Sequence, residues 1–210
     1  MVITANLILI IFTCLVSWQA IENPALSFKL SHYPYEVKRN KEYYRWITSG
    51  FVHANLPHLL FNMIALWFFG NGVEREFQSN FGEWTGRFVY VAFYFTAIVL
   101  ADITVYFKHQ NNASYLSLGA SGAVAAVLFS SIVFDPWIGI YLMFIPIPIP
   151  GIVFGVLYLI FEWWSGKKRM DNINHDAHFW GAIYGFFFTI IAIPDAYGDF
   201  VNKLIYHFQN

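Results

Sequence analysis

Long apolar runs alternate with short polar stretches along almost the whole chain of 210 residues. A helix needs about 20 apolar residues to cross a bilayer. The pattern therefore predicts an all-α polytopic membrane protein that folds as one domain over residues 1–210. Six transmembrane helices are expected, over residues 2–21, 57–71, 88–107, 121–134, 148–164 and 175–193.

Three stretches between or after these runs have a different character. Residues 22–56 carry five Lys and Arg side chains among many aromatic ones, too aromatic for disorder and too long for a simple turn. We expect this first loop to fold against the membrane surface with short amphipathic helices. The repeated prolines of residues 145–150 exclude a helix interior and predict an extended stretch. Residues 196–210 predict an amphipathic helix in the membrane interface.

Composition narrows the class of protein. The chain is 58% apolar and only 12% charged, whereas soluble domains carry about 25% charged residues. A net charge of −1 provides no basic stripe, so we expect no nucleic-acid partner. Cys14 is the single cysteine, which excludes an intramolecular disulfide. The first apolar run lacks a basic start and a small-residue cleavage site, so we interpret it as a retained transmembrane helix.

Ser121 opens the fourth apolar run and is the candidate nucleophile. Gly119 and Gly122 flank it, within a run of small and apolar residues. A serine in the first turn of a buried helix lies near free backbone N–H groups and the positive end of the helix dipole. That position suits an attack that creates an oxyanion. Small residues also favour close helix packing, and this motif alone does not separate the two interpretations.

Polar side chains within apolar helices are costly, so each is a candidate for function. His58 and Asn62 are four residues apart and therefore share one face of the second predicted helix. Both could donate hydrogen bonds to an oxyanion, or they could join neighbouring helices. His178 lies on the sixth predicted helix, beside a stripe of small residues formed by Ala177, Gly181 and Gly185. Such a stripe lets a neighbouring backbone come close.

Packing of this stripe on the Ser121 helix would bring Ser121 within hydrogen-bond reach of His178. A serine needs such a base to lose its proton. His175, one turn earlier, is the alternative base. Asp176 points to another side of the helix, so we expect a Ser–His dyad without a carboxylate. A metal site is an alternative, but no H-E-x-x-H motif or carboxylate-rich set accompanies His53, His58, His175 and His178.

Taken together, these motifs resemble those of the rhomboid family of intramembrane serine proteases. The matches, in chain order, are the end of the family's first loop (45–53), its H-x-x-x-N motif (58–62), its G-x-x-x-E helix end (Gly70 and Glu74), its G-x-S-G nucleophile motif (119–122) and its A-H-x-x-G-x-x-x-G base motif (177–185). Each motif is weak alone, but five in this order on these predicted helices are a specific signal.

The resemblance implies a six-helix core around a water-filled cavity that opens to the extracytoplasmic side. It implies Ser121 as the nucleophile and His178 as the base, with the Ser121 N–H, His58 and Asn62 forming an oxyanion hole. Transmembrane segments of other proteins would be the substrates, and no metal or cofactor is needed. It also implies cytoplasmic termini, and we expect the protein in a bacterial inner membrane. The positive-inside rule favours the opposite orientation.

Three positions depart from the family's pattern. Tyr44 stands where the first loop often has Trp before Arg, and Gln78 stands where Gly often follows Glu74. Ala125 stands where an aromatic side chain often packs on the catalytic histidine, so His178 is expected to be less firmly held. None of these departures removes a candidate catalytic group.

Two other classes of function are alternatives. A non-catalytic rhomboid-like protein would bind and escort client membrane proteins, but such relatives usually lack the Ser–His dyad that this chain has. A transporter is less favoured, because the chain has no internal repeats and, apart from Asp102, no evident intramembrane charge pairs.

Overall fold

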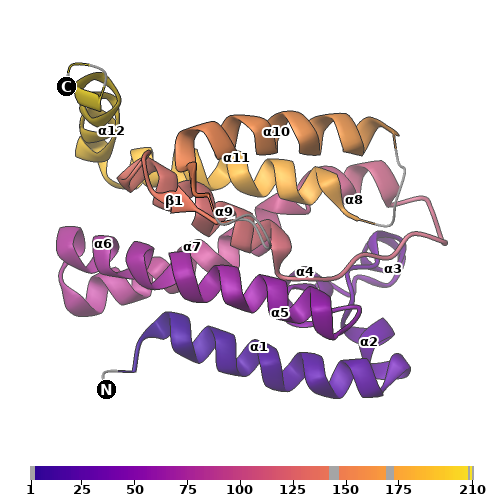
Figure 1. Cartoon of the computed structure of the whole chain (residues 1–210). Coiled ribbons are helices and arrows are strands. Elements are labelled where there is room, and N and C mark those ends of the chain that lie inside the picture. The colour runs from indigo at the N-terminus through magenta and orange to yellow at the C-terminus, as the bar shows by residue number, and fades with distance from the viewer. Residues whose placement is uncertain (1–2, 142–146, 169–172, 208, 210) are drawn as a thin grey trace.

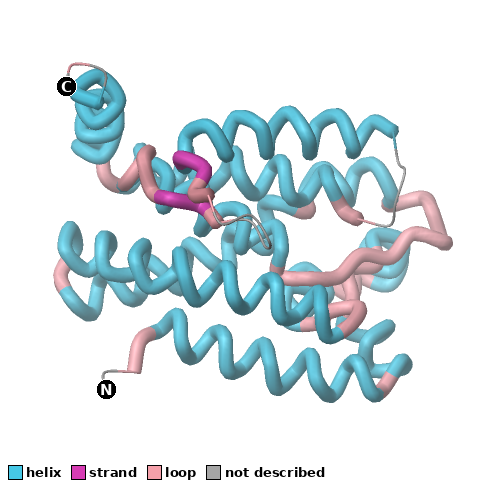
Figure 2. The backbone as a smooth tube through the Cα atoms, in the orientation of Figure 1, coloured by secondary structure: helices cyan, strands magenta, loops and turns pink. Residues whose placement is uncertain are grey.

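The computed structural model describes residues 3–141, 147–168, 173–207 and 209, and these form an almost entirely helical protein (Figures 1 and 2). In chain order the elements are α1 (Ala5–Glu22), α2 (Pro24–Leu30), α3 (Pro34–Asn40), α4 (Arg45–Thr48), η1 (Ser49–Phe51), α5 (Leu56–Ala65), η2 (Leu66–Gly70), α6 (Asn71–Phe81), α7 (Glu83–Ala101), α8 (Ile103–His109), α9 (Ser121–Phe134), β1 (Gly139–Ile140), β2 (Ile149–Pro150), α10 (Gly151–Lys168), α11 (His175–Ala192) and α12 (Pro194–His207).

Helix α9 is the central element of the bundle. Every residue from Gly122 to Val133 is buried, and the helix packs against α5, α6, α7, α10, α11 and α12. Figure 1 shows α10 and α11 on one side of it and α5 and α6 on the other, with α1 outermost beside α5. Because α9 is small and apolar along its length, it can be surrounded by protein, and its N-terminal Ser121 is held inside the bundle.

By length and composition, three helical segments can cross a membrane. They are α1, the run Leu56–Phe81 and the run Glu83–His109. The pair α11 and α12 would add a fourth, but the chain bends by 111° between them. Helix α9 is apolar but has only 14 residues. Length and composition therefore support three to four of the six predicted crossings.

The second and third helices are longer than predicted. The second continues beyond residue 71 to Phe81, and the third begins at Glu83 rather than near residue 88. The predicted end of the second helix at residue 71 is therefore wrong. A left-handed Gly82, at φ 83°, makes the turn instead. Within this helical run, Glu74 is satisfied by another element, Arg75 donates to the Asn71 carbonyl of its own helix, and Glu76 is exposed.

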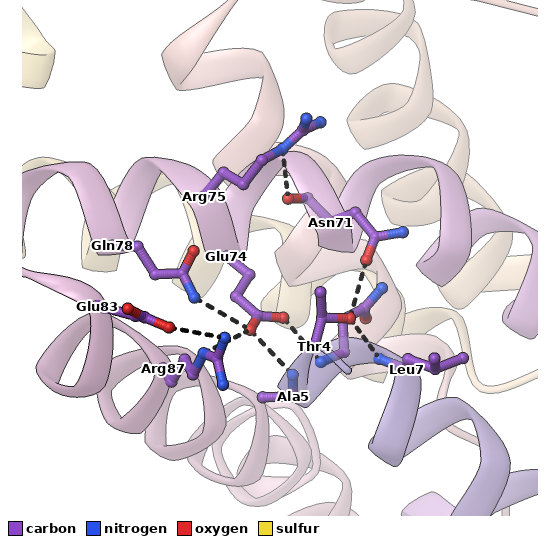
Figure 3. A network of polar contacts seen from close by, with 10 residues as sticks. Thr4, Ala5, Leu7, Asn71, Glu74, Arg75, Gln78, Glu83 and Arg87 are labelled. Atoms are coloured by element: carbon purple, nitrogen blue, oxygen red, sulfur yellow. Dashed lines mark hydrogen bonds and ion pairs between the residues drawn. The ribbon is translucent and has the colours of Figure 1, made fainter. Parts of the chain in front are cut away.

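Glu74 joins the second helix to the start of α1 (Figure 3). Its carboxylate is buried and accepts the backbone N–H groups of Ala5 at 2.9 Å and Asn6 at 2.8 Å. These are among the first N–H groups of α1, which have no acceptor within the helix. A Cβ at Gly70 would lie 2.3 Å from Asn6 Oδ1. The Gly70 and Glu74 motif is thus a close joint between two helices.

The departure at Gln78 has a structural counterpart on the neighbouring helix. A Cβ at Gly86 of α7 would lie 2.4 Å from Gln78 Cα. Gly86 therefore permits the close approach of α6 and α7.

Arg87 of α7 lies between Glu74 and Glu83 (Figure 3). Its guanidinium is 4.0 Å from the Glu74 carboxylate and 3.1 Å from that of Glu83.

The first loop is folded, as predicted, into α2, α3, α4 and η1. Arg45 is buried within it and donates to the carbonyls of Phe28 at 2.7 Å and Ser31 at 2.9 Å. The Arg45 guanidinium carbon also lies 5.5 Å from the centre of the Tyr44 ring. Tyr44 therefore offers the arginine an aromatic face in place of the tryptophan that is frequent in the family.

The predicted extended stretch and the predicted tail helix are both present in the described residues. Strand β2 pairs antiparallel with β1, while residues 145 and 146 lie outside the described part. Pro194 opens α12, which buries Ala196 and Phe200 and exposes Tyr197 and Tyr206. Helix α12 is therefore amphipathic, as expected, over the range that the structure describes.

Candidate active site

Ser121 occupies the first position of α9, and the backbone before it is specialised. Gly119 has φ 128°, a conformation that side chains other than glycine rarely adopt. A Cβ on Gly119 would lie 2.7 Å from His58 Cε1 and 3.7 Å from Ser121 Oγ. The glycine therefore lets the imidazole of His58 come close to the serine. The Ser121 and Gly122 N–H groups begin the helix and have no acceptor within it.

The first loop holds this backbone in place. His32 and Ser117 exchange two backbone hydrogen bonds, at 2.8 Å and 3.0 Å. The Gly119 N–H donates to the Ser49 carbonyl at 3.0 Å. The Ala120 N–H donates to His53 Nε2 at 3.2 Å. Anchors at Ser117, Gly119 and Ala120 therefore connect residues 32–53 to the turn that carries Ser121.

His53 is a structural histidine that links two elements. It is buried, and its Nδ1 lies 2.8 Å from Ser17 Oγ of α1. Because Nε2 accepts the Ala120 N–H, that nitrogen carries no proton, and Nδ1 is the donor to Ser17. Burial, with a smaller contribution from His58, lowers the pKa of His53 to about 3. A neutral imidazole therefore holds α1 and the Ser121 turn together.

The small-residue stripe brings the second candidate group to Ser121. A Cβ at Gly181 would lie 2.1 Å from the Gly122 carbonyl oxygen, and one at Gly185 would lie 2.0 Å from that of Ala126. Helices α9 and α11 are thus in backbone contact, as predicted. Because the two helices lie so close together, His178 Nε2 is 2.6 Å from Ser121 Oγ.

The expectation that no carboxylate adjoins His178 is wrong. Glu162 of α10 places Oε1 3.2 Å from His178 Nδ1 and Oε2 2.6 Å from His175 Nδ1. No sequence motif singled out Glu162; the signal was a lone acidic residue within an apolar helix. Asp176, as expected, faces elsewhere and pairs with Lys108.

The ligand atoms of Glu162, His175 and His178 lie within 4.8 Å of one another, a spacing that a cation could bridge. Both carboxylate oxygens already accept imidazole nitrogens, however. We therefore interpret this group as hydrogen-bonded and assign no metal ligands.

A cavity of about 690 Å³ collects the predicted site residues. His58, Asn62, Ser121 and His178 all line it. Asn62 Nδ2 also donates to the His58 carbonyl at 2.9 Å, one turn back in the same helix. The cavity is further lined by Ala125, Leu128 and Tyr158. Where the family often has an aromatic residue at position 125, this chain presents Tyr158 from α10 to the same space.

Asn174 is a further polar anchor that the sequence did not reveal. Its side-chain oxygen accepts the Ala177 N–H at 3.1 Å and caps the N-terminus of α11. Its amide nitrogen donates to Asp102 Oδ1 at 3.1 Å. Asp102 lies between α7 and α8. The Asn174–Asp102 hydrogen bond therefore attaches the start of α11, the helix of His178, to the third predicted helix.

Comparison with known proteins finds one family, both in a domain model and in individual relatives. The model of the Rhomboid domain matches residues 40–195. RHOMBOID-like protein 12, mitochondrial, of Arabidopsis thaliana is 30% identical over 145 residues, which are 65% of this chain and 42% of that protein. Rhomboid protease GluP of Bacillus subtilis is 30% identical over 173 residues, which are 78% of this chain and 29% of that protein.

Rhomboid protease GlpG of Klebsiella pneumoniae is 28% identical over 139 residues, which are 63% of this chain and 43% of that protein. The matched region therefore spans less than half the length of each of these three relatives.

Proposed function

The chain belongs to the rhomboid family, and on that premise we propose that it is an intramembrane serine endopeptidase with Ser121 as nucleophile and His178 as base. The observation that carries the proposal is the 2.6 Å contact between Ser121 Oγ and His178 Nε2 at the wall of a cavity between helices. Two of the three relatives described above are named rhomboid proteases, which supports the same chemistry. Family and apolar helices together make the chain an integral membrane protein.

The reaction uses the Ser121 and His178 pair twice. His178 Nε2 takes the Ser121 proton while Oγ bonds to the substrate's carbonyl carbon, and the carbonyl electrons move onto oxygen. When this intermediate collapses, the C–N bond breaks and His178 gives the proton to the leaving nitrogen. Water then attacks the resulting ester by the same route and restores the serine. A transmembrane substrate must unwind locally, since a helix hides its carbonyls, so small or helix-breaking residues are expected at the cut.

We assign the oxyanion hole to the Ser121 N–H, His58 and Asn62. The N–H stands free at the start of α9, and the two side chains line the cavity beside it. The geometry of Gly119 supports the role of His58, because only the missing Cβ leaves room for its ring. In a cavity walled by apolar helices, each donor is less screened than in water.

Asn62→Ala and His58→Ala should each slow cleavage without abolishing it. Loss of one side-chain donor from an oxyanion hole costs roughly 10²–10³ in kcat in a soluble serine protease. Here the N–H and the other side chain would remain, and fluorophosphonate should still label Ser121. Turnover per labelled molecule and the melting temperature are the measurements.

Asn80→Ala is the matched control for Asn62→Ala. Asn80 makes the same bond to the carbonyl one turn back, at 2.8 Å, but it does not line the cavity. If Asn62→Ala and Asn80→Ala both lower stability and neither changes turnover, then Asn62 only supports its helix and the assignment to the oxyanion hole is wrong.

We also propose that the chain crosses the membrane six times, with α9, α10 and α11 as crossings additional to the three long apolar segments. Helix α9 can be short because protein covers its sides. The proposed orientation places the first loop on the extracytoplasmic side and the termini in the cytoplasm, within a bacterial inner membrane. Transmembrane protein substrates and the lipid bilayer are the proposed partners.

The direct test is labelling and cleavage by the purified protein in liposomes. We expect a fluorophosphonate to label it stoichiometrically and a model transmembrane substrate to be cut, with chelators having no effect. The alternative, a non-catalytic protein that escorts membrane clients, predicts substrate binding with neither labelling nor cleavage. That result would overturn the proposed protease activity.

A further inference from the structure

We propose that Glu162 is a positioning residue for His178, so that the site works as a Ser121–His178–Glu162 triad rather than as a dyad. This inference rests on the proposed function and deepens it. It starts from the contact of Glu162 Oε1 with His178 Nδ1 at 3.2 Å, on the side of the imidazole opposite Ser121. A chain of hydrogen bonds therefore runs from the serine through the imidazole to a carboxylate.

Burial makes this carboxylate significant. The Glu162 side chain is only 5% exposed, in a helix that is otherwise largely apolar. A carboxylate in such a place is expensive unless its oxygens are satisfied. Here each oxygen faces one imidazole, with His175 Nδ1 at 2.6 Å from Oε2 and His178 Nδ1 at 3.2 Å from Oε1. The two histidines, together with the side chain of Tyr158, compensate for burying it.

The contact also determines which nitrogen of His178 carries the proton. An ionised carboxylate only accepts hydrogen bonds, so His178 Nδ1 must be the donor. His178 Nε2 is then left without a proton and can accept the one from Ser121. When it does, the imidazole becomes positive, and the adjacent carboxylate stabilises that charge without taking a proton itself.

His175 contacts Glu162 and acts on His178 through that carboxylate. It bonds the second oxygen of Glu162 and so holds the carboxylate plane toward His178. Among the described hydrogen bonds, that of Ser121 Oγ goes to His178 rather than to His175. His175 is therefore assigned as a support for Glu162, not as the base, and His175→Ala should slow cleavage less than Glu162→Gln does.

The effect of a substitution at Glu162 has to be judged against the other titratable groups around His178. The other titratable groups that act on this site are His175 on its own helix, His58 on α5, Tyr158 on α10 and Asp102 between α7 and α8. Glu162→Gln leaves His58 and Asp102 untouched, but it also changes the partner of His175 Nδ1. It keeps the size of the side chain but removes the charge and one acceptor, so it cannot accept from both imidazoles.

Kinetics of Glu162→Gln are the first measurement. We expect kcat to fall by at least tenfold and at most about 10⁴-fold, the loss known for removal of the triad charge in a soluble serine protease. KM should change little, because Glu162 does not line the cavity. Glu162→Asp should recover part of kcat.

Glu74→Gln is the matched control. Glu74 is the other glutamate buried in a helix joint, and it accepts backbone N–H groups of α1. Glu74→Gln should lower the melting temperature and leave turnover per labelled molecule unchanged. If Glu162→Gln behaves like Glu74→Gln, with unchanged turnover per labelled molecule, Glu162 is only structural and the proposal is overturned. Loss of activity on treatment of the wild type with EDTA would also contradict it, since the group would then hold a cation.

Nitrogen NMR of labelled histidine tests the proposal without any catalysis. In the wild type, His178 should be the Nδ1–H tautomer, and Glu162→Gln should change the tautomer or the shift. An Nε2–H tautomer in the wild type would overturn the proposal even if the protease activity stands. Conversely, wild-type protein with the expected tautomer but no labelling or cleavage would contradict the proposed function and leave the role of Glu162 in orienting His178 supported.

Discussion

Ser121→Ala should abolish cleavage of a transmembrane substrate, and His178→Ala should be as damaging. The two side chains share one proton across a 2.6 Å contact, so neither works alone. In a soluble serine protease, loss of either member of the pair costs about 10⁶ in kcat, and removing both costs no more. We therefore expect the double variant to be as slow as each single one. Initial rates in liposomes, with labelling to count active sites, are the measurement.

Ser131→Ala is the control for the serine. Ser131 lies on the same helix and is also buried, but its hydroxyl donates to the Leu128 carbonyl at 2.7 Å rather than to a histidine. It should retain cleavage and labelling. Cleavage at the normal rate by Ser121→Ala, or a double variant far slower than either single one, would be incompatible with the proposed pair.

Gly181→Ala should damage both fold and activity. The added Cβ would lie 2.1 Å from the Gly122 carbonyl oxygen, which is backbone and cannot rotate away. Overpacking costs roughly 1–3 kcal/mol and occasionally more, and we expect a value at or above the upper end. Helices α9 and α11 must separate, which moves His178 away from Ser121. A misplacement of about 1 Å can cost on the order of 10²-fold in rate.

Gly72→Ala is the control for this substitution. Gly72 is also within a helix, but a Cβ there would meet nothing within 4 Å. The change should be neutral or slightly stabilising, because alanine favours the helix. Melting temperature and turnover should be measured on both variants. Equal behaviour of the two would show that the backbones of α9 and α11 are not in contact at Gly181.

The sequence by itself determined the class of protein and the family. Apolar runs near bilayer length predict membrane helices because hydropathy depends on composition, which is local. The motifs around His58, Ser121 and His178 predicted the rhomboid family, and the match of the Rhomboid domain to residues 40–195 confirms it. The small-residue stripe of α11 also predicted its contact with α9, because only small side chains permit such an approach.

The tertiary structure decided what depends on distant segments. Glu162 is 16 residues from His178 and on another helix, so no local spacing could place its carboxylate against the imidazole. The burial of Glu74 within a helix depends on the N–H groups of α1, nearly 70 residues earlier in the chain. Hydrophobic periodicity describes one element at a time, whereas buried polar groups choose their partners across elements, and those choices are made only when the helices pack.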